Sequence, residues 1–272
     1  MGTIPLEDSF ADVVGKAQRG LGLSDAELAK RAGVSVEALA QVKSGKPLDD
    51  VLRKIAGPLG LNATALIELA NQRWRPATVS LDGLAQFNTR YEDMTVNAYV
   101  VWNPNSRQGF AFDTGATAEP MLDFVRERGI KILAILLTHT HGDHIADLDR
   151  LRRDTGAPVF CPEREALPGT ELFGEGKQWS EPGGLRVEAR LTCGHSVGGM
   201  TFVVSGLGRP VAVVGDALFA ASMGGGLVSF AEALDNNRRK IFTLPPQTIL
   251  CPGHGPMTTV GEELQHNPFY AR

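Results

Sequence analysis

The apolar pattern of this 272-residue chain changes near Trp74, and the change divides the sequence into two regions of different secondary structure. Before Trp74, short amphipathic runs are separated by glycines, and no alternating run is long enough to predict a strand. After Trp74, short apolar runs alternate with helical patterns. Pro76 cannot continue a helix and marks the linker. We predict a small all-helical domain over residues 1–75 and an α/β layered domain over residues 76–272.

The second region contains eight apolar runs that predict strands and three amphipathic runs that predict helices. Strands are predicted because the runs are short and rich in β-branched and aromatic residues. The predicted strands lie within 97–102, 109–113, 130–139, 157–161, 185–191, 200–206, 210–216 and 248–253, and the predicted helices within 119–129, 144–156 and 227–242.

Two serines and a glycine organise the middle of the helical region. Ser24 precedes DAELAKRA and Ser35 precedes VEALAQVK, and serine side chains cap the first turns of helices. Gly33 lies between the two runs, where a tight turn is expected. The residues resemble the lambda-repressor-like helix-turn-helix family over residues 8–72. That resemblance implies that the second helix reads DNA.

The charge of the helical region argues against DNA binding. Residues 1–75 hold ten Lys and Arg against nine Asp and Glu, which gives little attraction for phosphates. The second helix offers Glu37, Ala38 and Gln41 where base or phosphate contacts are usual. We expect this region to pack against a neighbouring chain, which gives a homo-oligomer, or against the α/β region, where it could form a lid. DNA binding is the less favoured alternative.

The motif THTHGDH, residues 138–144, is the strongest functional signal in the chain. It directly follows a long apolar run, so His139, His141, Asp143 and His144 leave one strand end in one loop. Imidazole and carboxylate groups suit Zn, Fe or Mn. Alternate residues can place His139 and His141 on one metal while Asp143 and His144 turn toward a second.

Three more potential ligands occur later in the chain, each after an apolar run and beside a glycine. They are His195 in GHS, Asp216 in GDAL and His254 in PGHG. A single histidine is more often a structural or surface residue than a metal ligand. Here five of the six histidines fall in these motifs, and only His266 lies outside them. This clustering predicts a metal site with close backbone approach.

In this order the motifs resemble those of the metallo-β-lactamase superfamily, across residues 77–270. The resemblance implies an α/β fold, a four-layer αββα sandwich, with two divalent metal ions. Zinc is the expected metal, and iron and manganese are the alternatives. The implied ligands are His139, His141 and His195 for the first metal, Asp143, His144 and His254 for the second, and Asp216 as a bridge between both.

Within the superfamily, GDALFA and CPGHGPMTTVGEELQHNPF are similar to C-terminal motifs of glyoxalase II, the hydroxyacylglutathione hydrolases. That branch carries a helical C-terminal extension that supplies part of its glutathione site, whereas 18 residues follow His254 here. Residues 220–247 are expected to line the pocket instead. Arg238, Arg239 and Lys240 in that segment either bind a substrate carboxylate or form a solvated helix face, and we favour the second interpretation.

The expected ligands suggest a reaction. A water between two divalent cations loses a proton near neutral pH, and the same metals can stabilise charge on a carbonyl oxygen. We therefore predict a metallo-hydrolase of a small-molecule thioester or ester that uses a metal-bridging hydroxide. Asp143 is the expected catalytic residue, because it can steer the proton of the water. Asp113 in FDTG is expected to support the metal loop without ligating a metal.

Two other functions use the same residues. One resembles the persulfide dioxygenase branch, with one Fe(II) held by His139, His195 and Asp216. The other is a DNA-binding regulator whose hydrolase-like domain senses a metabolite. The complete second ligand set favours hydrolysis over the dioxygenase. True β-lactamases are disfavoured, because Asp216 stands where many of those enzymes place a cysteine and because no export signal is visible.

Composition favours a cytoplasmic enzyme. The formal net charge of −4 argues against a protein that coats nucleic acid. No run approaches the roughly 18 apolar residues that a membrane span requires, and the N-terminal sequence lacks the basic and apolar parts of an export signal. Cys161, Cys193 and Cys251 form no CxxC pair, so we expect reduced thiols. We therefore expect a cytoplasmic location without membrane contact.

Overall fold

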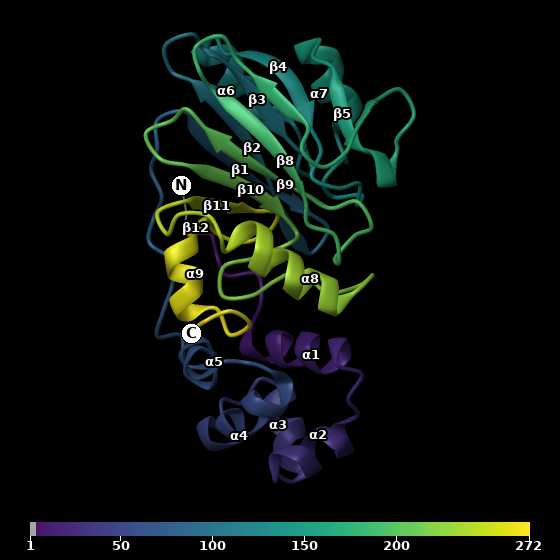
Figure 1. Ribbon diagram of the computed structural model, residues 1–272, viewed down its shortest axis with the longest axis vertical. Helices are drawn as coiled ribbons and strands as arrows, with labels where there is room; N and C mark the ends of the chain where they lie inside the picture. Colours follow the sequence, from purple (N-terminus) through teal and green to yellow (C-terminus); the bar gives the residue numbers. More distant parts are fainter. Residues whose placement is uncertain (1–3) are drawn as a thin grey trace.

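Five helices precede two β-sheets in the structure, a computed structural model that describes residues 4–272 (Figure 1). No helix in this part of the chain combines the length and the apolar character needed to cross a membrane. The first region is all-helical, as its amphipathic runs predict. Its helices are α1 (Phe10–Gly20), α2 (Asp25–Ala32), α3 (Val36–Lys43), α4 (Asp49–Leu59) and α5 (Ala63–Ala70).

The boundaries of α2 and α3 follow from local hydrogen bonds. The Ser24 hydroxyl accepts from the Glu27 backbone N–H at 3.3 Å, and the Ser35 hydroxyl accepts from the Ala38 N–H at 3.1 Å. Gly33 ends α2 in the left-handed conformation, with φ of 63°. These contacts confirm the two caps and the turn. Membership of a DNA-binding family stays a prediction.

The first sheet has its strands in chain order and changes from antiparallel to parallel pairing at β3. Phe112 of β3 lies opposite Leu136 of β4, so both strands end at the same edge of the sheet. Asp113 and the THTHGDH motif therefore leave the sheet side by side. The strands are β1 (Leu84–Tyr91), β2 (Met94–Asn103), β3 (Gln108–Phe112), β4 (Lys131–Leu136), β5 (Val159–Pro162) and β6 (Glu171–Phe173).

The second sheet places two other motifs together in the same way. Its order is β12-β11-β10-β9-β8-β7, and β10 and β11 are parallel neighbours. Gly215 pairs with Pro252, so Asp216 and Gly253 both follow strand ends. The strands are β7 (Gln178–Ser180), β8 (Arg186–Leu191), β9 (Met200–Ser205), β10 (Val211–Gly215), β11 (Ile249–Pro252) and β12 (Thr258–Thr259).

All eight apolar runs that predict strands contain one, and four strands were missed. Three of the missed strands, β6, β7 and β12, have two or three residues each, too few for an alternating pattern. In the fourth, β1, most side chains are half-buried and few are buried, so buried and exposed residues do not alternate. It is held by antiparallel pairing along β2, from Leu84–Val101 to Tyr91–Met94.

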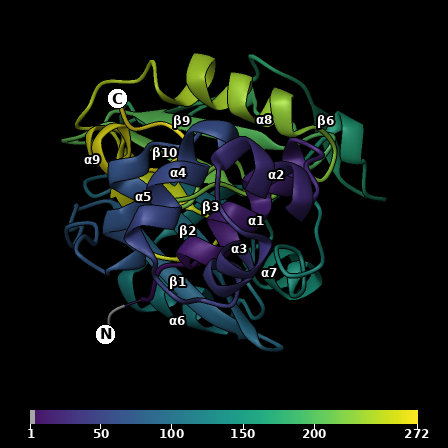
Figure 2. The same cartoon turned by 90° about the horizontal axis from the view of Figure 1, so that it is seen from below.

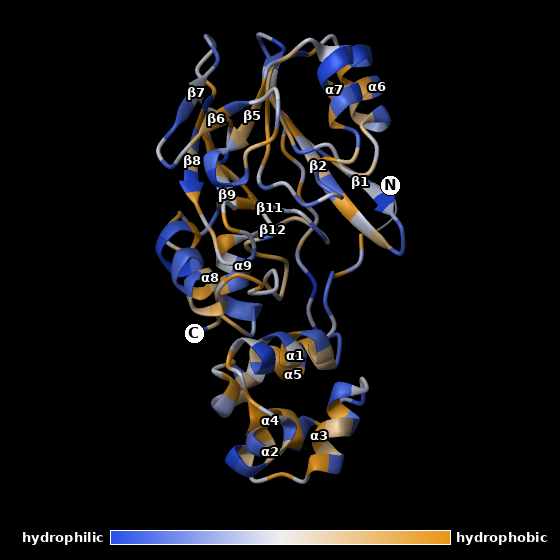
Figure 3. Ribbon diagram, turned by 90° about the vertical axis from the view of Figure 1, so that its right-hand side faces the viewer, coloured by the Kyte–Doolittle hydropathy of each residue, from blue (hydrophilic) through white to orange (hydrophobic). Residues whose placement is uncertain are grey.

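Helices cover the outer faces of both sheets, which confirms the αββα sandwich. Helices α6 (Glu119–Arg128) and α7 (Leu148–Thr155) pack on the first sheet, and α8 (Phe230–Asn236) and α9 (Val260–His266) pack on the second. Aromatic and β-branched side chains fill the space between the sheets, for example Phe112 and Phe202, whose ring centroids lie 5.3 Å apart. In Figure 3 the sheets lie between α6 and α7 on one side and α8 and α9 on the other.

Helices α1–α5 pack against the α8 and α9 side of the sandwich, which confirms the expected contact with the α/β region (Figures 1 and 2). Their buried side chains form one continuous apolar cluster with those of the second sheet's outer layer. At Gly20, an added Cβ would lie 2.2 Å from Phe230 Cγ, so α1 and α8 are in close contact. The His266 ring stacks on Trp74 at 4.6 Å and contacts Glu68 at 2.9 Å.

Candidate metal centre

A buried carboxylate fixes the start of the loop that follows β4. Asp113 has φ of +56° and accepts hydrogen bonds from the Thr138 backbone N–H and the Thr138 hydroxyl, both at 2.7 Å. The parallel pairing of β3 and β4 makes these contacts possible. Thr138 directly precedes His139, so Asp113 sets the direction in which the THTHGDH loop leaves the sheet.

Four side chains form a first group of potential metal ligands: His139, His141, His195 and Asp216. One ligand atom from each lies within 4.8 Å of the others. His141 Nδ1 lies 3.1 Å from His139 Nε2 and 3.0 Å from His195 Nε2. Three imidazole nitrogens directed at one another match the donor set of a three-histidine metal site.

Asp143, His144 and His254 form a second group beside the first. Asp143 Oδ2 lies 3.3 Å from His254 Nε2 and 3.6 Å from His144 Nε2. The structure thus brings together all seven residues of the predicted site, in the two sets that the resemblance implies, with Asp216 grouped with the first set. Their donors are imidazole nitrogens and carboxylate oxygens, which suit Zn, Fe or Mn.

Asp216 belongs to the first group and also reaches the second. Its Oδ2 atom is 3.3 Å from His195 Nε2 in the first group and 3.4 Å from His254 Nε2 in the second. Its Oδ1 atom is 3.3 Å from His144 Nε2. A carboxylate in this position can contribute one oxygen to each of two cations.

Two buried atoms at this point, His144 Nε2 and Asp216 Oδ1, lie 3.3 Å apart as an ion-pair contact, but neither makes a hydrogen bond of good geometry within the described residues. Their side chains are 0% and 8% exposed. Buried polar atoms almost always have a partner, and an orphaned one is costly. A divalent cation held by this carboxylate and imidazole would satisfy both atoms. The residues present therefore fit bound metal.

In four of the five site histidines, the ring nitrogen that faces away from the centre is hydrogen-bonded. Metal-binding histidines usually make such a contact, which fixes the ring orientation and the tautomer. The pairs are His139 Nδ1 with Thr138 Oγ1 at 3.0 Å, His144 Nδ1 with Asp113 Oδ2 at 2.8 Å, His195 Nδ1 with the Gly225 carbonyl at 3.0 Å, and His254 Nδ1 with the Thr95 carbonyl at 2.7 Å.

Two glycines let the backbone approach the centre. A Cβ added at Gly224 would lie 1.8 Å from the Asp216 carbonyl oxygen and 3.1 Å from His195 Nδ1. A Cβ added at Gly253 would lie 2.1 Å from Asp216 Oδ1 and 2.6 Å from His144 Cε1. Neither position can hold a side chain without displacing the site residues.

Burial and charge together set the protonation of the centre. Burial lowers the pKa of His139 and of His195. Burial also opposes the protonation of His144 and His254. The Asp216 carboxylate outweighs it, together with Asp113 at His144 and Asp143 at His254, and the two pKa values rise to about 10 and about 11. The second group therefore attracts positive charge.

The family follows from a comparison with known sequences. A family model described as "Metallo-beta-lactamase superfamily" matches residues 91–254, a range that contains all seven residues of the two groups. The chain belongs to this superfamily. The match covers the sandwich from the end of β1 to the loop after β11.

Two relatives within the superfamily have names that refer to hydrolysis. A probable metallo-hydrolase of Bacillus subtilis is 31% identical over 199 residues, which cover 64% of this chain and 91% of the relative. A hydroxyacylglutathione hydrolase of Cereibacter sphaeroides is 37% identical over 144 residues, 50% of this chain. Those residues are 54% of the relative, so the chain spans about half the length of that enzyme.

Two solved structures are similar to the sandwich of this chain. The BLEG-1 B3 metallo-beta-lactamase is 29% identical with a TM-score of 0.60, and the match covers 69% of this chain and 100% of that chain. A second protein, solved in a di-iron-bound form, is 27% identical with a TM-score of 0.55, covering 67% and 99% of the two chains. Each of these two matches leaves about a third of this chain uncovered.

One residue that no motif marked joins two ligand loops. Glu165, in the 3-10 turn η1 (Glu163–Glu165), accepts from the Thr140 backbone N–H at 2.8 Å and from the Gly198 N–H at 2.7 Å. Thr140 lies between His139 and His141 in the sequence. No motif marks Glu165 in the sequence, because its partners are two backbone N–H groups, which any residue could supply, and the Thr140 hydroxyl.

The basic triplet Arg238–Lys240 lies outside both ligand groups. Arg239 is paired along its own helix, and Lys240 Nζ donates to the Leu191 carbonyl at 2.7 Å. The Arg238 guanidinium lies 5.9 Å from the centre of the Tyr270 ring. Lys240 and Arg239 are thus engaged in local contacts. Within the described residues, none of these three side chains belongs to either group of potential metal ligands.

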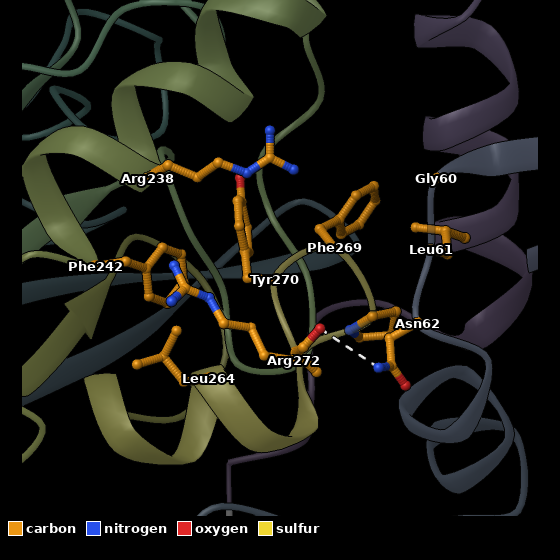
Figure 4. A pocket seen from close by; sticks show the side chains of 11 residues that line it. Gly60, Leu61, Asn62, Arg238, Phe242, Leu264, Phe269, Tyr270 and Arg272 are labelled. Carbon is orange, nitrogen blue, oxygen red and sulfur yellow. Dashed lines mark hydrogen bonds between the residues drawn. The ribbon is translucent and has the colours of Figure 1, made fainter. Parts of the chain in front are cut away.

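A cavity of about 380 Å³ lies between the α4–α5 turn and the C-terminal segment, and Figure 4 shows the side chains that line it. Asn62 from the turn, and Arg238, Tyr270 and Arg272 from the α/β part, line it. The Asn62 amide donates to the Ala271 carbonyl at 3.4 Å across the junction. None of the seven ligand-group residues lines this cavity, so it is separate from the metal centre.

Proposed function

We propose that this chain is a binuclear metal-dependent hydrolase that cleaves a small-molecule thioester or ester. The observation that carries the proposal is that Asp216 reaches both groups of ligand atoms, each of which is complete enough to hold a cation. The superfamily membership and the hydrolase names of the two relatives support it.

In the proposed site, the first group would hold one metal and the second group the other. His139, His141 and His195 would serve the first, Asp143, His144 and His254 would serve the second, and Asp216 would serve both. When bound, two divalent ions supply an activated water and Lewis-acid polarisation of a carbonyl oxygen. Zinc is the proposed metal, with iron and manganese as alternatives.

Asp143 is proposed as the residue that moves the proton. Its side chain is 13% exposed, more than the 8% of Asp216, so it is the more accessible of the two carboxylates. Burial raises its pKa, but contacts with His254 and His144 outweigh this effect and hold the pKa below its usual value. Asp143 is therefore ionised and can accept a proton at Oδ2 during attack on a carbonyl.

Metal content is the first test. Two metals per chain in the purified protein, with loss of turnover on chelation and recovery on readdition, would support the proposal. One iron per chain would favour the persulfide dioxygenase alternative. Elemental analysis of the intact chain distinguishes these results before any substrate is chosen.

A substrate panel is the second test. We expect S-acyl-glutathione to be cleaved with a kcat/KM at least about tenfold above that for a β-lactam or a phosphodiester, a difference of about 1.4 kcal/mol in transition-state binding. The β-lactam is included because of the similarity to BLEG-1. Oxygen consumption with glutathione persulfide, without thioester cleavage, would contradict the proposal.

A further inference from the structure

We propose that the N-terminal segment Pro5–Lys16 supports the metal centre itself, and that Lys16 and Asp8 are positioning residues for the loop that follows Asp216. The inference rests on the proposed metal site. The loop, Ala217–Gly224, is here called the Asp216 loop.

The Asp216 loop connects two site residues. It begins directly after Asp216 and ends at Gly224, where the backbone lies against the Asp216 carbonyl and His195 Nδ1. The next carbonyl, of Gly225, accepts the hydrogen bond from His195 Nδ1 at 3.0 Å. A shift of this loop would therefore move a proposed bridging carboxylate and release the orienting contact of a second ligand.

The loop has a backbone conformation that needs outside support. Phe219 and Ser222 exchange backbone hydrogen bonds at 3.2 and 3.0 Å, which makes a tight turn. Within the turn, Ala221 has φ of +61°, a left-handed conformation that is unfavourable for a residue with a Cβ. Such strain persists only where surrounding contacts hold it.

The N-terminal segment supplies contacts of this kind. Lys16 Nζ donates to the Met223 carbonyl at 2.8 Å and forms an ion pair with Asp8. The Asp8 carboxylate accepts from the Ser222 hydroxyl at 2.5 Å. The Lys16 and Asp8 side chains are only 14% and 9% exposed. Because the pair is largely buried, removing one partner leaves the other uncompensated beside the loop.

The same segment reaches a third site residue through an aromatic ring. Lys16 Nζ lies 5.0 Å from the centre of the Phe219 ring, and that ring meets His254 edge-on at 5.5 Å. Beyond His254, a Cβ at Gly255 would lie 3.2 Å from the Glu7 backbone nitrogen. The N-terminal segment therefore packs on the loops of both Asp216 and His254.

In the alternative role, Lys16 would only anchor α1 to the α/β region and would not affect the metal ligands. The two roles differ in what they predict for metal binding. Anchoring alone predicts a lower melting temperature with unchanged metal affinity and ligand geometry. Support of the Asp216 loop predicts weaker metal binding and an altered ligand field, because outer-shell contacts typically change metal affinity by about 10- to 100-fold.

The test compares Lys16→Met and Asp8→Ala with Arg19→Met in the full chain. Arg19 is an exposed cation on the same helix and serves as the matched control. Zn²⁺ affinity is measured by competition with a chelator, and the ligand field by the visible spectrum of the Co²⁺-loaded protein. We expect about tenfold or greater loss of affinity and a changed spectrum in the first two variants, and wild-type behaviour in the third.

Each outcome decides a different point. If the wild type binds two metals and both Lys16→Met and Asp8→Ala match it in affinity and spectrum, the inference is overturned while the proposed function stands. If the wild type binds no metal, the proposed function is wrong and the inference falls with it. If Lys16→Met does not fold, Asp8→Ala decides, because it keeps the contact of Lys16 with the Met223 carbonyl.

Discussion

Asp216 Oδ1 and His144 Nε2 lie 3.3 Å apart, and within residues 4–272 neither atom makes a hydrogen bond of good geometry. The two residues come from different sheets, since His144 follows β4 and Asp216 follows β10. The site is therefore formed where the two halves of the sandwich meet. The two residues stay close only if the ends of β4 and β10 lie at the same side of the sandwich.

Asp216→Ala should remove more metal than His141→Ala. Asp216 contacts both ligand groups, whereas His141 contacts only the first. We expect both variants to lose at least about 100-fold in turnover and to keep the wild-type circular dichroism spectrum. Elemental analysis should find less metal in Asp216→Ala. A fully active Asp216→Ala protein would show that this carboxylate is no bridge.

Asp113→Asn should weaken metal binding by about 10- to 100-fold without unfolding the chain. The substitution removes the charge beside His144 Nδ1, and asparagine tolerates the left-handed backbone that Asp113 adopts. Chelator competition measures the effect. Asp123→Asn, which breaks an exposed ion pair on α6, is the matched control. Equal affinities in the two variants would mean that Asp113 has no influence on the centre.

Gly253→Ala should abolish metal binding, because the new Cβ would overlap Asp216 Oδ1 and His144 Cε1. Gly57→Ala in α4 is the control, since no atom outside its own helix backbone and chain neighbours lies within 4 Å of its Cβ position. We expect Gly57→Ala to keep its metals. Any change in its unfolding free energy should be a loss, because a Cβ on the residue before Pro58 crowds the proline ring in a helix. Thermal melts with and without chelator compare them. Normal metal content in Gly253→Ala would contradict the assigned geometry.

Glu263→Gln should remove a pH dependence of stability. Burial raises the pKa of Glu263 from its ordinary value near 4.5 to about 7. The folded state then binds more protons than the unfolded state between these values. Stability from this group is fully present below pH 4.5 and is lost as pH rises to about 7, by roughly 3 kcal/mol.

The glutamine variant keeps the contacts but cannot ionise. Its amide can serve Thr258, the Ala221 N–H and Asn267, which now contact the carboxyl group. The unfolding free energy of the wild type minus that of the variant, measured from pH 4 to 8, should therefore fall as the pH rises from 4.5 to about 7. Glu262→Gln is the neighbouring control. A flat difference curve would contradict the raised pKa.

The sequence predicts the seven residues that the structure brings together because chemistry and topology coincide in them. His139, Asp216 and His254 each follow the end of an apolar strand within three residues, and glycines mark the places where the backbone approaches the site. Strand ends at one edge of a sandwich converge in space, so local motifs predicted a long-range cluster. The division at residue 75 stays a prediction, since buried residues from both sides of it form one apolar cluster.

The supporting contacts could not be predicted in the same way. Glu165, Asp8 and Lys16 act on backbone carbonyls, N–H groups or a single hydroxyl, which carry no sequence signature. Strand β1 was missed because its polar and apolar residues do not alternate cleanly, and its pairing with β2 decides its structure. Tertiary context therefore determined these features.

The contacts of the Asp216 loop have a consequence for the order of assembly during synthesis. Asp8 and Lys16 precede their partners Ser222 and Met223 by 214 and 207 positions. On the ribosome, α1 emerges long before the surface that it covers, so part of its apolar face stays exposed until the second sheet has formed. Contacts this distant in sequence also slow folding. The metal centre should thus be among the last parts of the chain to become ordered, and early metal capture would be confined to the loop after β4.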